Sequence, residues 1–389
     1  MRRLCSAIVL GLCCAPAVPR ENKTDLHGDP LPAGVATRLG TIRLRHAGPS
    51  NVIAWSPDGK LLAAADAAGP TQLWDLSTGK LLRQFGQGRS VSRVKLVFSP
   101  DGKLLAVGAA DIKLHEIATG QERQQISPTQ DVKALVFSPD GRYLVAGLNK
   151  GGMQVFEVAT GMRGSQVGDP LGDVQALAIS PDGATLAAAA ADTAVALWAK
   201  PPWRELARSA APLRLEPAEV EIFWKTLAQP DGRRAHQAIW ALTGASAQSV
   251  PFLRDKLKPA DAVTAKKVEQ YLRDLDNDNF GVREKATREL ELLGDQVETT
   301  LRAALADNSS LEARRRLGEI LEHLEDPPPE RLRLLRALEV LEHADSDDAR
   351  QALAALAKGG TGHWLTDSAR RARANAPRQN PALTGIKAE

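Results

Sequence analysis

Cysteine is scarce in this sequence, and its placement excludes several kinds of chemistry. The three cysteines, Cys5, Cys13 and Cys14, all lie at the N-terminal end. The rest of the chain therefore offers no disulfide, no thiol nucleophile and no thiolate metal site. Aromatic residues are also few, at 4% of the sequence, so the core must be built mostly from leucine, alanine and valine.

The sequence also has no large excess of positive or negative charge. The chain has 50 basic and 47 acidic residues and a formal net charge of +3. This balance gives no electrostatic basis for nucleic acid or an anionic membrane as the main partner. Two short basic clusters, 314–316 and Arg370–Arg371–x–Arg373, are interpreted as solvated helix faces. Beyond the N-terminal region no stretch is apolar enough for a stable membrane span.

Catalytic signatures are missing too. The sequence contains no Gly-x-Ser-x-Gly elbow, no phosphate-binding glycine loop and no His-Glu-x-x-His motif. Glu319 and Glu339 lie four residues before His323 and His343 on expected helices, so each pair could share a face and hold a metal. We interpret the pairs instead as exposed neighbours on charged helices. The prediction is therefore no catalytic residues, no cofactor and no metal.

The N-terminal region has the pattern of a secretory signal. Arg2 and Arg3 precede a short apolar run, and Ala15-Pro16-Ala17 resembles a cleavage site. We predict a signal peptide over 1–17 and a linker over 18–34. Cleavage would place the protein outside the cytoplasm, in the periplasm or secreted, and a retained N-terminus would leave it cytoplasmic. Lipidation through Cys13 or Cys14 is a further alternative.

The sequence Ser-Pro-Asp-Gly occurs four times, beginning at Ser56, Ser99, Ser138 and Ser180. A period of about 40 residues indicates a repeat architecture. In each unit an alternating strand precedes the turn and further short strands follow it, so each unit is predicted to consist of four short strands. Proline fixes φ, aspartate bonds to the local backbone, and glycine accepts a positive φ. This role in the turn explains the four aspartates without catalysis.

The period, the repeated turn and Leu73-Trp74-Asp75 resemble WD40 repeats over residues 36–208. The resemblance implies a β-propeller, which we place at 35–208. The repeats are degenerate, because the Trp-Asp pair is complete only at Trp74 and the family's structural aspartate fits only at Asp192. TolB-type propellers share the turn and stay a fold alternative. Trp74, Trp198 and Phe156 are interpreted as blade core.

Four units leave open how the propeller closes. WD40 rings usually have seven blades, and an incomplete ring exposes edge strands. Residues 35–45 are predicted to form one extra strand, which could complete a terminal blade. Three outcomes remain: an arc capped by the second domain, a ring completed by a second copy in a homo-oligomer, or a shortened descendant of a longer propeller.

After Pro201-Pro202 the hydrophobic period becomes helical, which predicts an α-helical domain over 213–378 and a disordered tail over 379–389. In 280–294, Val282, Ala286, Leu290 and Leu293 share one face. Paired amphipathic helices of this length resemble HEAT-type repeats. Ten helices are expected: 218–228, 233–242, 249–257, 262–275, 280–294, 296–306, 311–324, 329–343, 347–358 and 366–374.

Together these patterns predict a multidomain β + α protein, with a partial WD40-like β-propeller of four blades followed by an α-helical HEAT-like repeat domain. The combination resembles large WD40-repeat proteins of planctomycete-type bacteria. Repeats without catalytic motifs predict a non-enzymatic scaffold for protein–protein interaction, with protein partners. The alternative is an extracytoplasmic sensor or TolB-like propeller that binds a small ligand or peptide.

Overall fold

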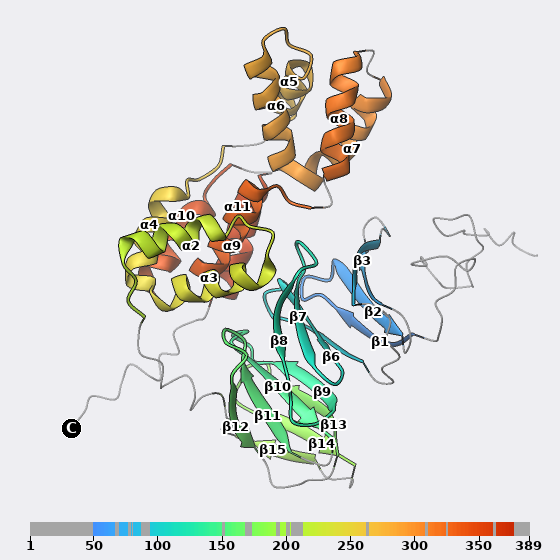
Figure 1. Ribbon diagram of the computed structural model, residues 1–389, viewed down its shortest axis with the longest axis vertical. Helices are drawn as coiled ribbons and strands as arrows, with labels where there is room; N and C mark the ends of the chain where they lie inside the picture. Colours follow the sequence, from blue (N-terminus) through green and yellow to red (C-terminus); the bar gives the residue numbers. More distant parts are fainter. Residues whose placement is uncertain are drawn as a thin grey trace, which may run out of the picture. The chain divides into compact units, whose positions relative to one another are not determined.

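The computed structural model describes most of residues 50–376. Within that span it leaves out 67–69, 77–78, 80, 87–93, 150–151, 168–172, 192–194, 200–202, 204–212, 262–263, 308–309, 324–325 and 361–362. The predicted signal peptide, the linker, the extra strand at 35–45 and the tail at 379–389 lie outside the described residues. In the described part, strands extend to Trp198 and a series of helices begins at Pro217 (Figure 1).

The strands form four antiparallel sheets in chain order, and each sheet is one blade of the partial propeller. Blade 1 holds β1 (Ser50–Trp55), β2 (Leu61–Asp66), β3 (Thr71–Asp75) and β4 (Leu81–Phe85). Blade 2 holds β5 (Lys95–Phe98), β6 (Leu104–Gly108), β7 (Ile112–Glu116) and β8 (Glu122–Ile126). Blade 3 holds β9 (Val132–Phe137), β10 (Tyr143–Leu148), β11 (Met153–Glu157) and β12 (Arg163–Val167). Blade 4 holds β13 (Val174–Ile179), β14 (Leu186–Ala190) and β15 (Val195–Trp198).

The repeated Ser-Pro-Asp-Gly turn connects the first and second strands of every blade, as predicted. In blade 3 the Ser138 hydroxyl donates to Asp140 Oδ1 at 2.5 Å, and that carboxylate accepts the Arg142 backbone N–H at 3.1 Å. Gly141 has a φ of 70°, which favours glycine. The other three turns repeat these bonds and the positive φ.

The blades keep one register, so equivalent residues can be compared from blade to blade. Four cross-strand pairs occupy the same place in successive blades: Leu62–Trp74, Leu105–His115, Leu144–Phe156 and Leu186–Trp198. Phe156 is buried in the core between blades 2 and 3, as predicted, whereas Trp74 and Trp198 are half-buried. Three apolar clusters join blade 1 to 2, 2 to 3 and 3 to 4.

All ten predicted helices are present, with ends a few residues from those expected. They are α2 (Pro217–Thr226), α3 (Gly232–Gly244), α4 (Ser246–Lys256), α5 (Ala265–Asp274), α6 (Phe280–Leu293), α7 (Glu298–Asp307), α8 (Leu311–His323), α9 (Pro329–His343), α10 (Asp347–Leu356) and α11 (Trp364–Asn375). One apolar core unites α2, α3, α4, α9, α10 and α11, and a separate core unites α5 to α8. No helix in the described ranges is long and apolar enough to cross a membrane.

Candidate functional site

Helix α9 carries a stripe of charged side chains that is buried. Arg336, Glu339 and Glu342 follow one another at intervals of three residues, and His343 lies four residues after Glu339, so all four lie on one side of the helix. Their exposed fractions are 1%, 2%, 2% and 6%. Burying four ionisable groups requires partners of opposite charge. Those partners come from blade 2.

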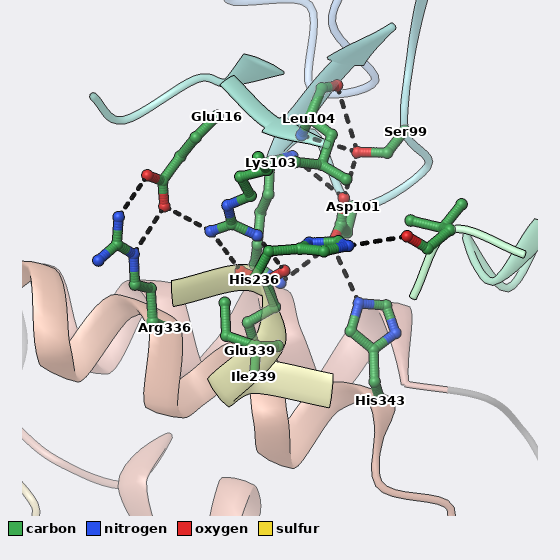
Figure 2. Close-up of polar contacts among 12 residues, drawn as sticks. Ser99, Asp101, Lys103, Leu104, Glu116, His236, Ile239, Arg336, Glu339 and His343 are labelled. Atoms are coloured by element: carbon green, nitrogen blue, oxygen red, sulfur yellow. Dashed lines mark hydrogen bonds and ion pairs between the residues drawn. The ribbon is translucent and has the colours of Figure 1, made fainter. Parts of the chain in front are cut away.

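Two arginines and two glutamates form the centre of this contact (Figure 2). Arg123 on β8 binds Glu339 with both terminal nitrogens, at 2.6 and 3.0 Å, and also pairs with Glu116 at the end of β7. Arg336 binds both carboxylate oxygens of Glu116, at 2.9 and 2.6 Å. Bidentate arginine–carboxylate pairs of this kind fix orientation as well as distance. Blade 2 and α9 are therefore held in a defined position.

A second group of charges extends the contact along α9. Lys103, in the turn after β5, pairs with Glu342 and lies 3.3 Å from Asp101 Oδ2. Nε2 of His343 lies 3.5 Å from the same Asp101 oxygen. The eight residues of the two groups are called the junction network below. They are Asp101, Lys103, Glu116, Arg123, Arg336, Glu339, Glu342 and His343.

Other helix residues support the junction network. Nη1 of Arg336, the nitrogen that does not bind Glu116, donates to the carbonyls of Leu227 and Gln229 just after α2, at 2.8 and 2.7 Å. From α3, Nε2 of His236 donates to the Val158 carbonyl at 2.8 Å, and the ring of Trp240 lies 5.0 Å from that of His343. The network therefore ties α2, α3 and α9 to blades 2 and 3.

The environment shifts the pKa values of the buried carboxyl groups in opposite directions. Burial by itself raises the pKa of Glu116, but Arg123 and Arg336 outweigh it and hold that pKa well below the usual range. Burial also raises the pKa of Glu339, but the positive charges of Arg123 and Lys103 outweigh it, and the pKa is lowered. At Glu342 burial prevails over Lys103, and the pKa is raised. Glu116 and Glu339 are thus ionised acceptors, which suits ion pairing rather than proton donation.

The structure corrects the interpretation of Glu339 and His343 as exposed neighbours, because both are buried. Together with Asp101 they form a group whose oxygen and nitrogen atoms lie within 4.8 Å of one another, which is compatible with metal-ligand spacing. Both oxygens of Glu339, however, already accept hydrogen bonds from Arg123. The geometry therefore favours ion pairs. In the other predicted pair, Glu319 binds Arg315 at 2.5 Å, and the side chain of His323 lies outside the described residues.

The aspartates of the repeated turn do not all act alike. Asp101 makes the predicted bonds within its turn, but it also faces Lys103 and His343. The role in the turn therefore explains Asp101 only in part. Its pKa is also lowered, because Lys103 and the bonds from His343 and Ser99 outweigh burial.

The basic clusters divide in a similar way. Arg314, Arg315, Arg370, Arg371 and Arg373 are exposed, in agreement with solvated helix faces. Arg316 is buried and pairs with Glu284 and Glu312 at 2.8 and 2.6 Å. The interpretation as a solvated face is wrong for Arg316, which joins α6 to α8 from inside.

A cavity of about 510 Å³ lies beside the junction network. The turns of blades 1 and 2 contribute Asp58 and Asp101, α9 contributes Leu335 and Leu338, and α11 contributes Arg371 and Asn375. Charged and apolar groups thus meet in one space large enough for a small molecule or a peptide side chain.

Comparison with known proteins identifies the blades. The family model "Anaphase-promoting complex subunit 4 WD40 domain" matches residues 45–95, and the model "WD domain, G-beta repeat" matches 120–155 and 165–199. The chain contains WD40 repeats. These matches cover blades 1, 3 and 4 and the end of blade 2, and no catalytic family is indicated.

Curated relatives agree with this assignment. The chain is 34% identical over 84 residues to the small ribosomal subunit protein RACK1y of Oryza sativa subsp. japonica, which is 21% of this chain and 24% of that protein. It is 35% identical over 92 residues to the cross-pathway control WD-repeat protein 2 of Flammulina velutipes, or 23% and 29% of the two chains. The chain thus spans about a quarter of the length of these relatives. Among solved structures, the computationally designed Ika4 protein matches with 26% identity and a TM-score of 0.35, over 40% of this chain and 94% of that one.

The sequence reasoning missed the junction network. Arg123 and Glu339 are 216 positions apart, and neither belongs to a known motif. A signal was nevertheless present in α9, where charged residues recur every three or four positions on a helix that is otherwise rich in leucine. That pattern indicates a helix whose polar side meets a charged partner.

Proposed function

We propose that this protein is a non-enzymatic scaffold that binds protein partners through its WD40 blades and its helical domain. The junction network is the observation that carries the proposal. It holds blade 2 and α9 together through bidentate ion pairs whose side chains are only 1% to 3% exposed. Two repeat-built parts joined rigidly can present their surfaces to a partner with little loss of conformational entropy. The WD-repeat relatives support this function.

The chemistry of the junction supports a role without catalysis. General acid–base catalysis needs a group whose pKa lies near the working pH. The carboxyls of Glu116 and Glu339 are shifted away from that range, and arginines occupy their oxygens. We therefore propose that the protein acts without a catalytic residue, cofactor or metal.

The helical domain is proposed to contribute a partner surface of HEAT-like type. Helices α5 and α6 pack as one pair and α7 and α8 as the next, around a shared core. Phe280 begins α6 and Leu311 begins α8, and their exposed fractions are 63% and 82%. The ends of these two helices are linked by a bond from the Ser310 hydroxyl to Asp276. Large exposed apolar side chains are suited to anchoring a partner.

Purification of the full chain from its native source tests the scaffold proposal. A stoichiometric protein complex, identified by cross-linking and mass spectrometry and weakened by Phe280→Asp or Leu311→Asp, is expected. Arg314→Asp, an exposed change in the same helix as Leu311, is the matched control and should retain the partner. A chain that purifies alone, or that converts compounds of a metabolite panel, would overturn the proposal.

The cavity favours a second candidate function, the binding of a small ligand or peptide. Its volume of about 510 Å³ falls in the range of ligand sites, and charged groups line it beside leucines. A panel of amino acids and short peptides should then raise the melting temperature of the wild-type chain. Ala118→Trp, which narrows the cavity, should abolish that rise. Unchanged melting temperatures across the panel would exclude this function.

We also propose that the N-terminal 1–17 segment directs the chain out of the cytoplasm and is removed, as its basic start and short apolar run suggest. Mass spectrometry of the protein from fractionated native cells tests this. A mature N-terminus near residue 18 in the extracytoplasmic fraction is expected, and an intact Met1 in the cytoplasm would contradict it. The kinship with planctomycete-type bacterial proteins is a further proposal, to be tested by the source of full-length homologues.

A further inference from the structure

Each blade has two faces, and the blades of this chain stack by placing a back face on a front face. The front face is the one that packs on the preceding blade, and in blade 2 it includes Phe98 and Leu105. The back face packs on the following blade, and in blade 2 it includes Ile112 and Leu114. Among the residues that the structure describes, this contact occurs three times, and there the front of blade 1 and the back of blade 4 have no neighbouring blade.

The back face of blade 4 is exposed at positions that are buried in every other blade. Leu197 pairs with Ala187 across β14 and β15, and its equivalents by register are Leu73, Leu114 and Val155. Those three are 0% exposed, whereas Leu197 is 70% exposed. Val195 is 67% exposed, and its equivalents Ile112 and Met153 are 0% and 1% exposed. Blade 4 thus carries core residues on an uncovered surface.

The front face of blade 1 shows the same pattern. Trp55 precedes the turn of its blade as Phe98 and Phe137 precede theirs. Phe98 and Phe137 are 6% and 5% exposed, but Trp55 is 59% exposed. Ile53, two residues earlier on the same face, is 63% exposed. An open tryptophan beside an open isoleucine is an apolar patch of the kind that marks an interface.

The two open faces are complementary to each other. On blade 4 the register places Ala176, Ala178, Ala187, Ala189, Val195 and Leu197 on the back face. This surface is apolar and made mostly of small residues, so the large rings of Trp55 and Trp74 on the front of blade 1 can approach it closely. The cluster between blades 3 and 4 shows the same kind of contact within this chain, because Trp198 on the front face of blade 4 packs on the back face of blade 3. Each open face thus offers the kind of surface that would fit the other.

We propose that two copies of this chain join head to tail, with blade 4 of each copy packed on blade 1 of the other, to close an eight-bladed ring. Within one chain the two faces do not cover each other, because Trp55 and Leu197 both remain mostly exposed. Propellers close with about four to eight blades. Two four-bladed copies reach that limit, whereas three copies would exceed it. A head-to-tail contact that closes in this way gives a discrete dimer rather than a filament.

The oligomeric state of the full chain tests this proposal. Light scattering coupled to size-exclusion chromatography should give twice the mass of one chain. Trp55→Arg and Leu197→Arg should each weaken self-association by roughly tenfold or more, because each places a charge in an apolar contact. Ile222→Arg on α2, where the wild-type residue is 60% exposed, is the matched control and should stay dimeric. Circular dichroism should show all three variants folded, because each changed side chain is exposed.

Mixing the two variants distinguishes the head-to-tail arrangement from one in which each face packs on the same face of the other copy. A Trp55→Arg chain and a Leu197→Arg chain can form one contact in which neither face is altered, so the mixture should recover dimers that each variant lacks alone. A dimer broken by only one of the two changes, or by neither, would overturn the proposal, as would a full chain of single mass at every concentration.

A photo-cross-linking amino acid at position 197 of the full chain identifies what covers the face. Cross-links to blade 1 of another copy are expected. Cross-links to residues 1–49 of the same chain would assign the face to that segment and overturn the ring. This inference does not depend on the scaffold function, since a ring can form whether or not a further partner binds.

Discussion

Replacing Arg123 by methionine should show how much the junction network stabilises the protein. The Arg123 and Glu339 side chains are 1% and 3% exposed and are joined by bonds of 2.6 and 3.0 Å. Arg123→Met keeps the volume but leaves Glu339 buried without its main cation. Breaking a buried pair from one side costs about 3–5 kcal/mol of unfolding free energy.

The double variant Arg123→Met/Glu339→Leu separates this penalty from the net value of the pair. Apolar replacement of both partners removes the unpaired charge, so it should cost less than the sum of the two single changes. We expect a coupling energy of about 2–3 kcal/mol. The matched control is Arg315→Met/Glu319→Leu on α8, where the side chains are 52% and 48% exposed. An exposed pair of that kind contributes less than about 1 kcal/mol.

Equilibrium urea unfolding measures these values, with circular dichroism for overall folding. Because the chain has seven tryptophans, the junction is followed by the resolved fluorine NMR signal of fluorotryptophan at position 240. Trp240 reports on the junction because its ring lies 5.0 Å from that of His343. In Arg123→Met the two signals should also separate, since blades and helices lose their common ion pairs. Coincident transitions together with a loss below about 1 kcal/mol, or with strictly additive single effects, would refute the role given to the network.

Three further predictions concern single residues. Burial and the nearby Arg123 lower the pKa of His236 from 6.5 to about 4. The neutral folded form is therefore fully favoured above pH 6.5, and about 3 kcal/mol of unfolding free energy is lost as the pH falls toward 4. In His236→Gln, the unfolding free energy measured across that range should depend less on pH. Gly294→Ala should lower the melting temperature, because φ at this position is +59°, a backbone conformation that side chains other than glycine rarely adopt. Gly318→Ala, with nothing within 4 Å of the added Cβ, should instead raise the melting temperature through about 1 kcal/mol of helix propensity. Ser138→Ala should cost about 1–2 kcal/mol in urea unfolding, because the buried hydroxyl bonds to Asp140 and to the Tyr143 N–H; an unchanged midpoint would contradict that role.

The blades and helices were predictable because their signals are local. The Ser-Pro-Asp-Gly turn encodes its own hydrogen bonds and its positive φ within four residues, so the strand order follows from its spacing. Helix ends were predicted to within a few residues, and in the structure capping residues mark some of them. Asn279 accepts the Gly281 N–H at 2.8 Å, and Gly294 ends the same helix.

The junction network was not predictable from local pattern, because its partners lie far apart in the chain. Charged residues on a helix usually face water, and that expectation failed for Glu339 and Arg316, which meet partners on other elements. Burial of Trp74 was also expected from its place in the repeat. The residue is only half-buried because blade 1 has no preceding blade in the described chain.

The distance in sequence between Arg123 and Glu339 has a consequence for synthesis on the ribosome. These partners are 216 positions apart, so at about 5–20 residues per second the arginine emerges roughly 10–40 s before its glutamate. During that interval the nascent blades can fold locally, and Arg123, Glu116 and Lys103 stay hydrated at the surface that α9 will cover. Charge on a surface awaiting its partner discourages aggregation between neighbouring nascent chains, a benefit that an apolar junction would not provide.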